Sequence, residues 1–529
     1  MLKRLKDAFA ARKDLSKGNK IVINCEKLES RVALVEDGSL EEYSIERVGD
    51  EHIVGSIYKG RVKNIEQGLK AMFIDIGLDK NAFLHFWDAI PAALDGELEE
   101  IQRGDSSPKK KEKGKRITSK DIPTLYPVGA EMLVQVTKGP IGTKGPRVTT
   151  NISLAGRFMV LMPLNEMFGI SRKIEDPKER RRLRRIMEKL TVPEGMGIIM
   201  RTVAQGQRAR FFVRDLRMLL AQWEEIDTAR NAKRAPMRAF EEPDLIERTV
   251  RDFLTDEVDE VICDDLETVE RMQKIVGEIS RRAKKRIIYF PSPEPIFHRL
   301  GVQKQIDNAF FRQVWLPCGG YLVIDETEAM IAIDVNTGRN KGAKNIDKMI
   351  YETNMESAEE VARQLRLRNI GGLIVVDFID MKSRRDQQAV YKHMKDRLKR
   401  DKAKTQVLPI SALGLMEMTR QRLSESLSTS MHDPCPYCEG KGAIKSTLSM
   451  SVELQRQITS IMQKYPDDHH DLVIVVNPEV MHRLRTEDGE LLVELERRHH
   501  GRLTFRSDPT YHREKVLISD AVTNREVKV

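Results

Sequence analysis

The sequence predicts an α/β protein built from several domains, and four observations lead to this prediction. Its 529 residues correspond to roughly three or four compact units. Residues 319–381 carry a strand–helix–strand pattern, which pairs two strands in parallel across a helical connection. Residues 56–90 carry several short strands with glycine turns, the pattern of a small barrel. Helix and strand patterns alternate again over residues 446–529.

Composition places the chain among soluble proteins with real hydrophobic cores. Hydrophobic residues make up 40% and charged residues 32%, and no apolar run approaches the ~18 residues of a membrane helix. The net charge of +9 is modest, so nucleic-acid binding has to be argued from where the basic residues lie. Five scattered cysteines are too few for a disulfide scaffold and favour the reducing cytoplasm.

Two lysine-rich segments are predicted to lie outside the compact units. Residues 1–18 have the pattern of a short basic amphipathic helix without the apolar core of a secretory signal. We expect a solvated extension there, and weak association with a membrane surface is the alternative. Residues 104–120 lack periodicity and predict a disordered insertion in a barrel loop. Such a loop either attracts phosphate groups or is simply solvated.

The first half of the chain predicts a hairpin followed by a barrel. Residues 20–24 and 31–36 read as the hairpin, and the strands at 56–62, 71–77 and 81–86 fit an OB-type barrel, whose open face stacks bases. Two aromatic side chains on these strands have two interpretations, barrel core or base stacking. They are Phe73 and Phe83. The basic run at 178–185 reads as a solvated helix face that also attracts RNA.

The strand–helix–strand pattern is the most informative part of the sequence. Residues 321–325 and 329–335 predict a hairpin, and the helix that follows is predicted to stop at Gly371-Gly372. The continuous apolar run at 373–378 predicts a strand buried on both faces. A basic helix over 384–404 and a strand over 406–410 complete this region.

Two aspartates are predicted to meet at one edge of this sheet. Asp334 and Asp377 end the two parallel strands, where open α/β sheets bind ligands. Asn336 adds a neutral oxygen, so the three side chains form a plausible Mg²⁺ site. The alternative is that Asp334 caps a turn over residues 336–338 and Asp377 caps the segment after its own strand. The residues alone leave both interpretations open.

A cysteine pair near residue 435 has the spacing of half a zinc site. Cys435 and Cys438 lie in a tight turn followed by glycines, and the same pair of a second chain would complete a tetrahedron. His432 is an alternative ligand within the chain. The Cys-Pro-Tyr-Cys spacing also matches a glutaredoxin motif, which needs a strand before the pair and a helix that starts at its first cysteine.

Three stretches together resemble the catalytic core of the bacterial ribonuclease E/G family: AIDVNTGR (332–339), GGLIVVDFIDM (371–381) and GLMEMTRQRL (414–423). The resemblance implies a magnesium-dependent, ribonuclease G-like endoribonuclease, without a long disordered tail. It implies cleavage of single-stranded RNA to 5′-phosphate and 3′-hydroxyl products, in the processing of rRNA and tRNA precursors and in mRNA decay. The rival functions are a non-catalytic RNA-binding or chaperone protein and a DNA nuclease.

The resemblance also assigns roles to individual residues. It implies that Asp334 and Asp377 hold Mg²⁺ with Asn336 in support, and that Asp380 is not a direct ligand. It implies RNA contacts by Phe73, Phe83 and Lys144. It implies a pocket for a 5′-monophosphate, with phosphate contacts from Arg201 and Thr202, a lining from Gly156 and Val160, and support from Arg172. It implies structural Zn²⁺ held by Cys435 and Cys438 of two chains, hence a homodimer that can pair into a homotetramer.

The domain map implied by the resemblance divides the chain into six parts. Residues 1–35 and 246–309 form an RNase H-like domain, 36–150 an OB-fold RNA-binding domain of the ribosomal S-one type, and 151–245 a 5′ sensor. A DNase I-like catalytic domain (310–431), a zinc link (432–445) and a small C-terminal α/β domain (446–529) follow.

Overall fold

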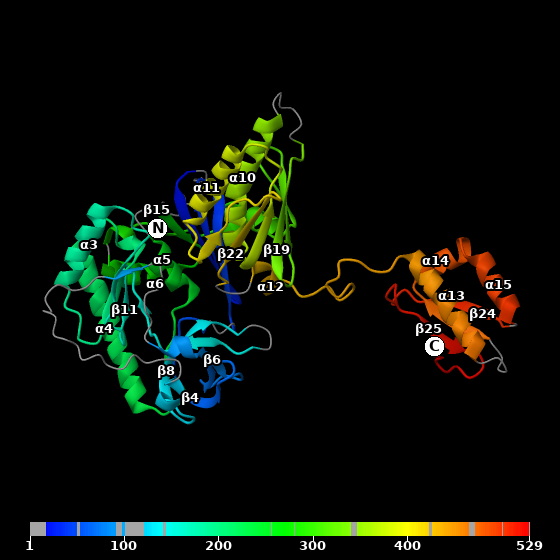
Figure 1. The fold of residues 1–529 in the computed structure, drawn as a ribbon, viewed down its shortest axis with the longest axis horizontal. Coiled ribbons are helices and arrows are strands. Elements are labelled where there is room, and N and C mark those ends of the chain that lie inside the picture. Colours follow the sequence, from blue (N-terminus) through cyan, green and yellow to red (C-terminus); the bar gives the residue numbers. More distant parts are fainter. Residues whose placement is uncertain are drawn as a thin grey trace. The chain divides into compact units, whose positions relative to one another are not determined.

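The computed structural model describes most of the chain as two compact units, Met1–Ser430 and Met431–Val529 (Figure 1). The residues described are 17–49, 53–90, 98–100, 121–140, 144–254, 257–279, 281–339, 346–422, 426–464, 471–499 and 501–527. The lysine-rich insertion and all but the end of the predicted N-terminal helix therefore lie outside them. Among the described residues, none of the helices combines the length and the apolar character needed to cross a membrane.

The first sheet joins the beginning of the chain to a segment far along it. Its strand order is β16-β15-β1-β2-β3, antiparallel from β1 to β3 and parallel from β1 to β16. The predicted hairpin is confirmed as β1 and β2. Because β3 pairs with β2, the sheet runs past the boundary predicted after residue 35. The strands are β1 (Asn19–Cys25), β2 (Glu29–Glu36), β3 (Ser39–Arg47), β15 (Val258–Cys263) and β16 (Ile287–Tyr289), with α5 (Leu245–Phe253) and α6 (Leu266–Ile279) packed on them.

The second sheet closes into an OB-like barrel, as the short alternating strands predict. Five strands follow the order β4-β5-β6-β9-β8, and β8 pairs back onto β4. A further strand from much later in the chain, β14, adds to β4. The strands are β4 (Ile57–Glu66), β5 (Ala71–Asp75), β6 (Ala82–His85), β8 (Glu131–Lys138), β9 (Arg147–Thr149) and β14 (Met237–Phe240).

The third sheet has the order β10-β11-β13-β12-β7 and packs against two helices. The helix α3 begins at Pro177 because Asp176 caps it, accepting a hydrogen bond from the backbone N–H of Lys178. The elements are β7 (Leu98–Glu100), β10 (Leu154–Ala155), β11 (Met159–Met162), β12 (Phe168–Ser171), β13 (Gly197–Met200), α3 (Pro177–Lys189) and α4 (Ala209–Ala232).

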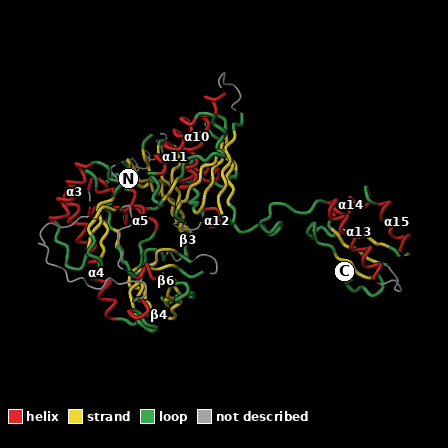
Figure 2. Tube along the Cα trace, in the orientation of Figure 1, coloured by secondary structure: helices red, strands yellow, loops and turns green. Residues whose placement is uncertain are grey.

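The fourth sheet, which we call the carboxylate sheet, contains the predicted strand–helix–strand unit. Its order is β17-β18-β19-β20-β22-β21, and β19 and β20 run parallel across α10. The helices α10 and α11 pack on one face of it (Figures 1 and 2). The elements are β17 (Gln313–Trp315), β18 (Tyr321–Glu326), β19 (Met330–Asn336), β20 (Gly372–Asp377), β21 (Thr405–Val407), β22 (Leu415–Arg420), α10 (Ile346–Leu367) and α11 (Arg384–Leu398).

Four local predictions for this sheet are wrong. The strand β20 alternates between buried and exposed residues, and Leu373 is 44% exposed, because the helices cover only one face of the sheet. The helix α10 stops before the predicted glycines, because Asn369 takes a left-handed conformation (φ 51°) and the N–H of Ile370 bonds the carbonyl of Leu365. The helix α11 ends at Leu398, and β21 covers Thr405–Val407 rather than 406–410.

The second unit is a small α/β domain, and the alternating helix and strand patterns predicted over residues 446–529 are confirmed. The three strands follow the order β24-β23-β25, with β24 parallel and β25 antiparallel to β23. Its elements are α13 (Thr447–Lys464), β23 (Leu472–Val476), α14 (Pro478–Thr486), α15 (Gly489–His499), β24 (Leu503–Ser507) and β25 (Leu517–Asp520). The remaining short helices in the described part of the chain are η1 (Phe86–Ala89), α2 (Ile122–Leu125), η2 (Thr202–Ala204), α7 (Arg281–Lys284), α8 (Ile296–Arg299), α9 (Gln303–Asn308) and α12 (Leu427–Met431).

Candidate active site

The two predicted aspartates are direct neighbours in the carboxylate sheet. The parallel register of β19 and β20 pairs Asp334 with Asp377. Both side chains lie on the uncovered face of the sheet, while Ile333 and Val376 beside them in sequence point into the core. The alternation of a β-strand therefore places two carboxylates side by side in solvent, on a backbone that the core holds rigid.

The third predicted residue, Asn336, bonds one of these carboxylates. Its amide nitrogen donates a 2.7 Å hydrogen bond to Oδ2 of Asp334. This bond joins two side chains, whereas the turn-capping alternative would use a backbone N–H of residues 336–338. It orients the Asp334 carboxylate and does not use the amide oxygen of Asn336.

A buried asparagine that the sequence reasoning missed holds the segment after β20. Asn354 on α10 is fully buried; its amide donates to the carbonyl of Ile379 (2.8 Å) and its carbonyl accepts from the N–H of Ile379 (3.1 Å). Gln387 on α11 adds a 2.8 Å bond to the carbonyl of Met381. A signal was present, because Asn354 is a polar residue four positions before Ala358 on the predicted apolar face of the helix.

Negative charge accumulates around Asp377. The pKa of Asp377 lies above its usual value because of partial burial and because of the nearby charges of Asp334 and Asp380. Asp380 lines a pocket of about 230 Å³ beside the edge, close to Gly414, where an added Cβ would lie 3.1 Å from Oδ1 of Asp380. Clustered carboxylates with an amide oxygen are the donor set of a hard divalent cation, so these residues fit Mg²⁺.

The arginine of the stretch 414–423 that lies on β22 has a structural role in the sheet. Arg420 on β22 is buried, forms a two-pronged ion pair with Asp401 (2.6 and 3.1 Å) and donates to the carbonyl of Ile370. Lys173 from the turn after β12 donates to the backbone carbonyl of Asp401 (2.9 Å). Arg420 therefore anchors the start of β20, and Leu423 at the end of the stretch lies outside the described residues.

The barrel residues Phe73 and Phe83 face outward rather than into the barrel core. They are register neighbours on β5 and β6, half-buried, with ring centroids 5.9 Å apart in an edge-to-face arrangement. The core is filled instead by their sequence neighbours, such as Met72 and Leu84. Lys144 is exposed and lies two residues before Pro146, whose carbonyl accepts from the N–H of Phe83. The structure thus places the two aromatic side chains together on the outer face of the barrel, with Lys144 in the segment that pairs beside β6.

The residues of the predicted 5′ sensor surround one end of the third sheet. Arg201 follows β13, and its Nη1 donates to the carbonyl of Gly156 and to Oδ1 of Asp252, both at 2.7 Å. Thr202 begins η2 directly after it, and Val160 on β11 lies opposite Ile199 of β13. Arg172 is exposed in the turn after β12.

Glycine is required at position 156 by the buried carboxylate of Asp215. A Cβ there would lie 2.7 Å from Oδ2 of Asp215. The two oxygens of this carboxylate together accept hydrogen bonds from the backbone N–H groups of Arg157, Phe158 and Met159. Burial raises the pKa of Asp215, although these three N–H groups oppose the shift. The loop between β10 and β11 is therefore wrapped around one carboxylate.

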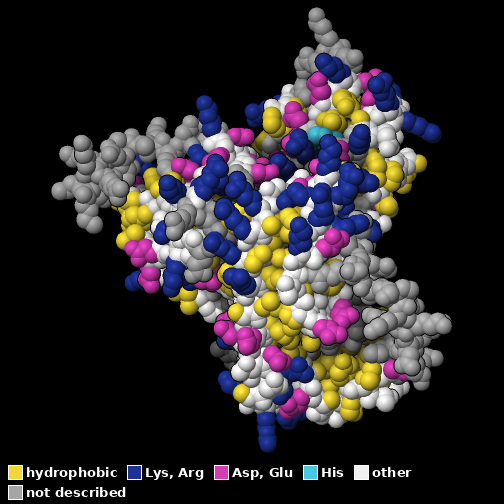
Figure 3. All heavy atoms as spheres, turned by 90° about the vertical axis from the view of Figure 1, so that its left-hand side faces the viewer, with side chains coloured by type: hydrophobic (Ala, Val, Ile, Leu, Met, Phe, Trp, Pro, Cys, Tyr) yellow, Lys and Arg dark blue, Asp and Glu magenta, His cyan; other side chains and the backbone are white. Residues whose placement is uncertain are grey.

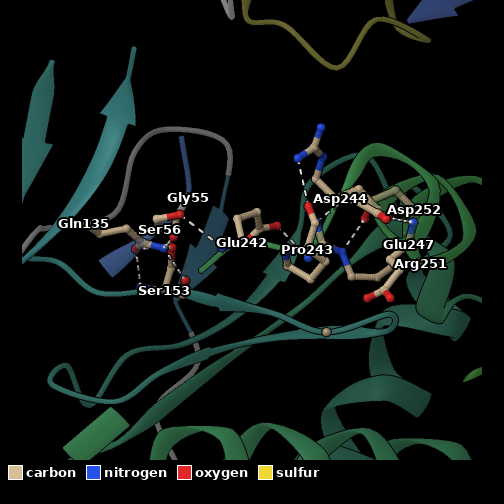
Figure 4. A network of polar contacts seen from close by, with 12 residues as sticks. Gly55, Ser56, Gln135, Ser153, Glu242, Pro243, Asp244, Glu247, Arg251 and Asp252 are labelled. Atoms are coloured by element: carbon tan, nitrogen blue, oxygen red, sulfur yellow. Dashed lines mark hydrogen bonds and ion pairs between the residues drawn. The ribbon is translucent and has the colours of Figure 1, made fainter. Parts of the chain in front are cut away.

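A polar network connects Arg201 to the barrel, and Figure 4 shows its part from Asp252 to Ser56. Arg251 donates to Asp252, the partner of Arg201, and to Glu242 (2.7 Å). The backbone N–H of Glu242 donates to Ser56 at the start of the barrel (3.0 Å). Burial acts to raise the pKa of Asp252, but the charges of Arg201 and Arg251 outweigh it and hold that pKa below the usual value.

Basic side chains gather on the side of the first unit that carries α3. Figure 3 faces this side, and its Lys and Arg side chains lie close together there. The helix α3 contributes Lys178, Arg180, Arg181, Arg182, Arg184, Arg185 and Lys189. Such a surface attracts phosphate groups at low ionic strength.

The cysteine pair lies in the second unit, in a turn between α12 and α13. The N–H of Gly442 donates to Sγ of Cys438 (3.4 Å), and hydrogen bonds from the backbone of Cys438 and Tyr437 lower the pKa of Cys435. The next helix begins only at Thr447, so the helix start that a glutaredoxin site needs at the first cysteine is not present. His512 bonds the carbonyl of Tyr437 (2.6 Å) and so ties the turn to the domain.

Comparisons with known proteins match the chain over almost its whole length. The family model described as "Ribonuclease E/G family" matches residues 153–423, and "RNase E/G, Thioredoxin-like domain" matches residues 434–521. The chain is 36% identical over 495 residues to "Ribonuclease G" of Escherichia coli (strain K12), covering 94% of this chain and 98% of that protein. It is 38% identical over 442 residues to "Ribonuclease E" of the same organism, covering 83% of this chain and 40% of that protein. With the paired aspartates in place, these matches establish that the chain belongs to the ribonuclease E/G family.

Proposed function

We propose that the protein is a magnesium-dependent endoribonuclease that cleaves single-stranded RNA and leaves 5′-phosphate and 3′-hydroxyl ends. Membership of the ribonuclease E/G family supports the class of enzyme. The observation that supports this site is the register that pairs Asp334 with Asp377 on an open sheet face. Processing of rRNA and tRNA precursors and decay of mRNA, in the cytoplasm, are the processes that such an activity would serve.

The chain's own groups provide a rigid, negatively charged cradle for the reaction. Asp334 and Asp377 would hold Mg²⁺, with Asn336 fixing the orientation of Asp334. When bound, Mg²⁺ would neutralise charge on the scissile phosphate and lower the pKa of a bound water. Asn354 keeps the backbone after Asp377 in place. In the overall reaction a water oxygen bonds phosphorus, the bond to the 3′ oxygen breaks, and that oxygen ends protonated.

Two further surfaces would position the RNA strand. Phe73 and Phe83 would stack on bases, which is worth about 1–3 kcal/mol per base, while Lys144 pairs with phosphate. Arg201 and Thr202 would contact a 5′-monophosphate in the pocket lined by Gly156 and Val160, with Arg172 in support. Nη1 of Arg201 is used within the protein, so its remaining N–H groups would meet the phosphate.

The oligomer that we propose is a homodimer linked by Zn²⁺ between the Cys435 and Cys438 pairs of two chains, able to pair into a homotetramer. The exposed cysteine turn and the lowered pKa of Cys435 support thiolate ligation. Chelation of zinc should halve the mass of the oligomer in analytical ultracentrifugation, because it breaks the link between the two chains of each dimer. An unchanged mass would contradict the link, and the variant Cys435→Ser should match the chelated protein.

The decisive experiment compares two variants of the same sheet. Asp377→Asn should abolish cleavage of a labelled single-stranded RNA in Mg²⁺ while RNA binding persists. Asp325→Asn is the matched control, because Asp325 lies on the adjacent strand β18 and forms an ion pair with Arg312. Near wild-type cleavage by Asp377→Asn would refute the assignment.

The same assay separates the rival functions. A non-catalytic RNA-binding or chaperone protein would bind the RNA and leave it intact in every variant. A DNA nuclease would digest a deoxy oligonucleotide of the same sequence. Substrates with 5′-phosphate and 5′-hydroxyl ends test the sensor, because Arg201→Lys should remove any preference for the phosphate and leave the rate on the hydroxyl substrate.

A further inference from the structure

A second cluster of ligand-type side chains lies in the first sheet and contains none of the site residues described above. Cys25 ends β1 and Cys263 ends β15, two parallel strands whose carboxyl ends share one edge. Asp264 follows Cys263 directly. Among the described residues, these three form the one group of three cysteine, histidine or acidic side chains whose ligand atoms lie within 4.8 Å of one another.

The distance between the two sulfurs distinguishes a metal site from a disulfide. The Sγ atoms of Cys25 and Cys263 are 4.0 Å apart. Two thiolates on one tetrahedral Zn²⁺, with Zn–S bonds of about 2.3 Å, are separated by about 3.8 Å. A disulfide requires about 2.0 Å, so the sulfurs would have to approach each other by half of their separation. The geometry matches the metal site without rearrangement.

The carboxylate of Asp264 is held in place beside the sulfurs. Its Oδ1 accepts from the backbone N–H of Cys25 (2.9 Å) and its Oδ2 from the side chain of Asn24 (2.6 Å). Asn24 is only 3% exposed, and its own oxygen accepts from Nε of Arg31 (2.8 Å). Each carboxylate oxygen keeps a lone pair, and hydrogen-bonded outer residues of this kind orient metal ligands.

The surroundings suit a borderline-soft cation and leave one position open. Cys263 is buried and Cys25 half-buried, and the hydroxyl of Thr268 on α6 lies 3.6 Å from Sγ of Cys25. A pair of buried thiols alone would be read as small hydrophobic side chains. The Asp264 carboxylate is held beside the two sulfurs, so it and a thiolate repel each other once a thiol ionises. A bound divalent cation removes that repulsion.

We infer that Cys25, Cys263 and Asp264 form a binding site for a zinc-like divalent cation, with water as the fourth ligand. Binding releases one proton from each thiol and forms two metal–sulfur bonds and one metal–oxygen bond. The ion would join the end of β1 to the end of β15 and to Asp264 directly after it, and β1 is far from both in sequence. The site does not depend on the proposed nuclease function or on the cysteine pair of the second unit.

The test starts from the full chain with Cys435→Ser and Cys438→Ser, which removes the other thiolate pair. Titration with Co²⁺ should give one equivalent of bound metal with a thiolate-to-cobalt charge-transfer band, and Zn²⁺ should bleach that band. Adding Cys25→Ser should abolish the band. Adding Cys318→Ser is the matched control and should retain it, because Cys318 lies in the carboxylate sheet region beside Thr353.

A second measurement covers the case in which Cys25→Ser does not fold. In the same background, Zn²⁺ should slow alkylation of Cys25 at least tenfold while Cys318 reacts at an unchanged rate, and Mg²⁺ should protect neither. The inference is overturned if the background variant shows no charge-transfer band, or if Cys25 is not protected. It is also overturned if Zn²⁺ fails to protect and oxidised glutathione joins Cys25 to Cys263 instead.

Discussion

Two edges of the first unit are built on the same backbone plan and carry different chemistry. At the β19–β20 edge, parallel strands end in two exposed carboxylates. At the β1–β15 edge, parallel strands end in two thiols with one carboxylate, partly buried beneath α6. The topology brings the side chains together in both cases, and their donor atoms and exposure decide which ion fits. Oxygen ligands in solvent suit hydrated Mg²⁺, whereas sulfur ligands under a helix suit zinc.

The largest expected effect comes from exchanging the donor type at the carboxylate edge. Asp377→Cys should lower RNA cleavage in Mg²⁺ by roughly a hundred- to a thousand-fold, the scale for losing one charge-stabilising group. Mn²⁺ or Cd²⁺ should restore part of the rate, because these ions accept thiolate better than Mg²⁺ does. Initial rates on one RNA in each metal measure this, with Asp325→Cys as the control. Full activity of Asp377→Cys in Mg²⁺ would show that the donor atom at position 377 does not determine which ion supports cleavage.

The next effect concerns stability at the thiol edge. In the chain carrying Cys435→Ser and Cys438→Ser, Zn²⁺ at a hundred times its Kd should stabilise the fold by about 2.7 kcal/mol. Equal concentrations of Mg²⁺ should have no such effect, because the site offers two sulfurs. Denaturant unfolding with each ion gives both values. Stabilisation that survives Cys25→Ser would assign the zinc effect to another site.

A smaller effect is expected from Asn354, which holds the backbone after Asp377 and is not one of the proposed Mg²⁺ ligands. Asn354→Ala leaves the N–H and carbonyl of Ile379 without their partner, which should cost about 2 kcal/mol of stability. The kcat should fall about tenfold with little change in KM, because the backbone after Asp377 is released. Ser357→Ala on the same helix is the control, since its hydroxyl bonds only the carbonyl of Thr353. An unchanged kcat would limit Asn354 to a packing role.

The smallest effect tests a carboxylate that is neutralised by arginines rather than by a metal. Asp252 has a lowered pKa, so its ion pairs stabilise the fold above the unfolded-state pKa of about 3.9, and this contribution is lost as the pH falls through the folded-state pKa. Asp252→Asn should therefore cost about 1.5 kcal/mol at pH 7 and progressively less below pH ~4. Denaturant midpoints across this range measure the difference. Asp227→Asn, whose pair with Arg230 is exposed, should change stability little at any pH.

The sequence predicted the strands and the helix that carry Asp334 and Asp377 better than it predicted which faces of these strands are buried. The hairpin, the crossover helix and the paired ends of β19 and β20 follow from periodicity and from the handedness of such connections. The exposure of one face of the sheet does not follow from the sequence, because an apolar run such as 373–376 looks the same whether helices cover one face or both. Only the arrangement of α10 and α11 in three dimensions decides that Leu373 faces solvent.

Other features depended on contacts between distant segments, which no local pattern contains. The left-handed Asn369 ends α10 before the glycines that local preference favoured. The strand β14 joins the barrel from beyond the third sheet, and Asn354 on α10 bonds Ile379, which comes after β20. The sequence does not predict that Cys25 and Cys263 are neighbours, because they are 238 positions apart along the chain.

That separation has a consequence for how the molecule is made. The strand β1 is synthesised before the barrel and the third sheet, and its parallel neighbour β15 only after them. At about 5–20 residues per second, the 238 residues between the two thiols take on the order of 12–48 seconds. The nascent chain thus carries a half-finished sheet with an unpaired edge throughout that interval, and the inserted segments have time to fold before it is completed.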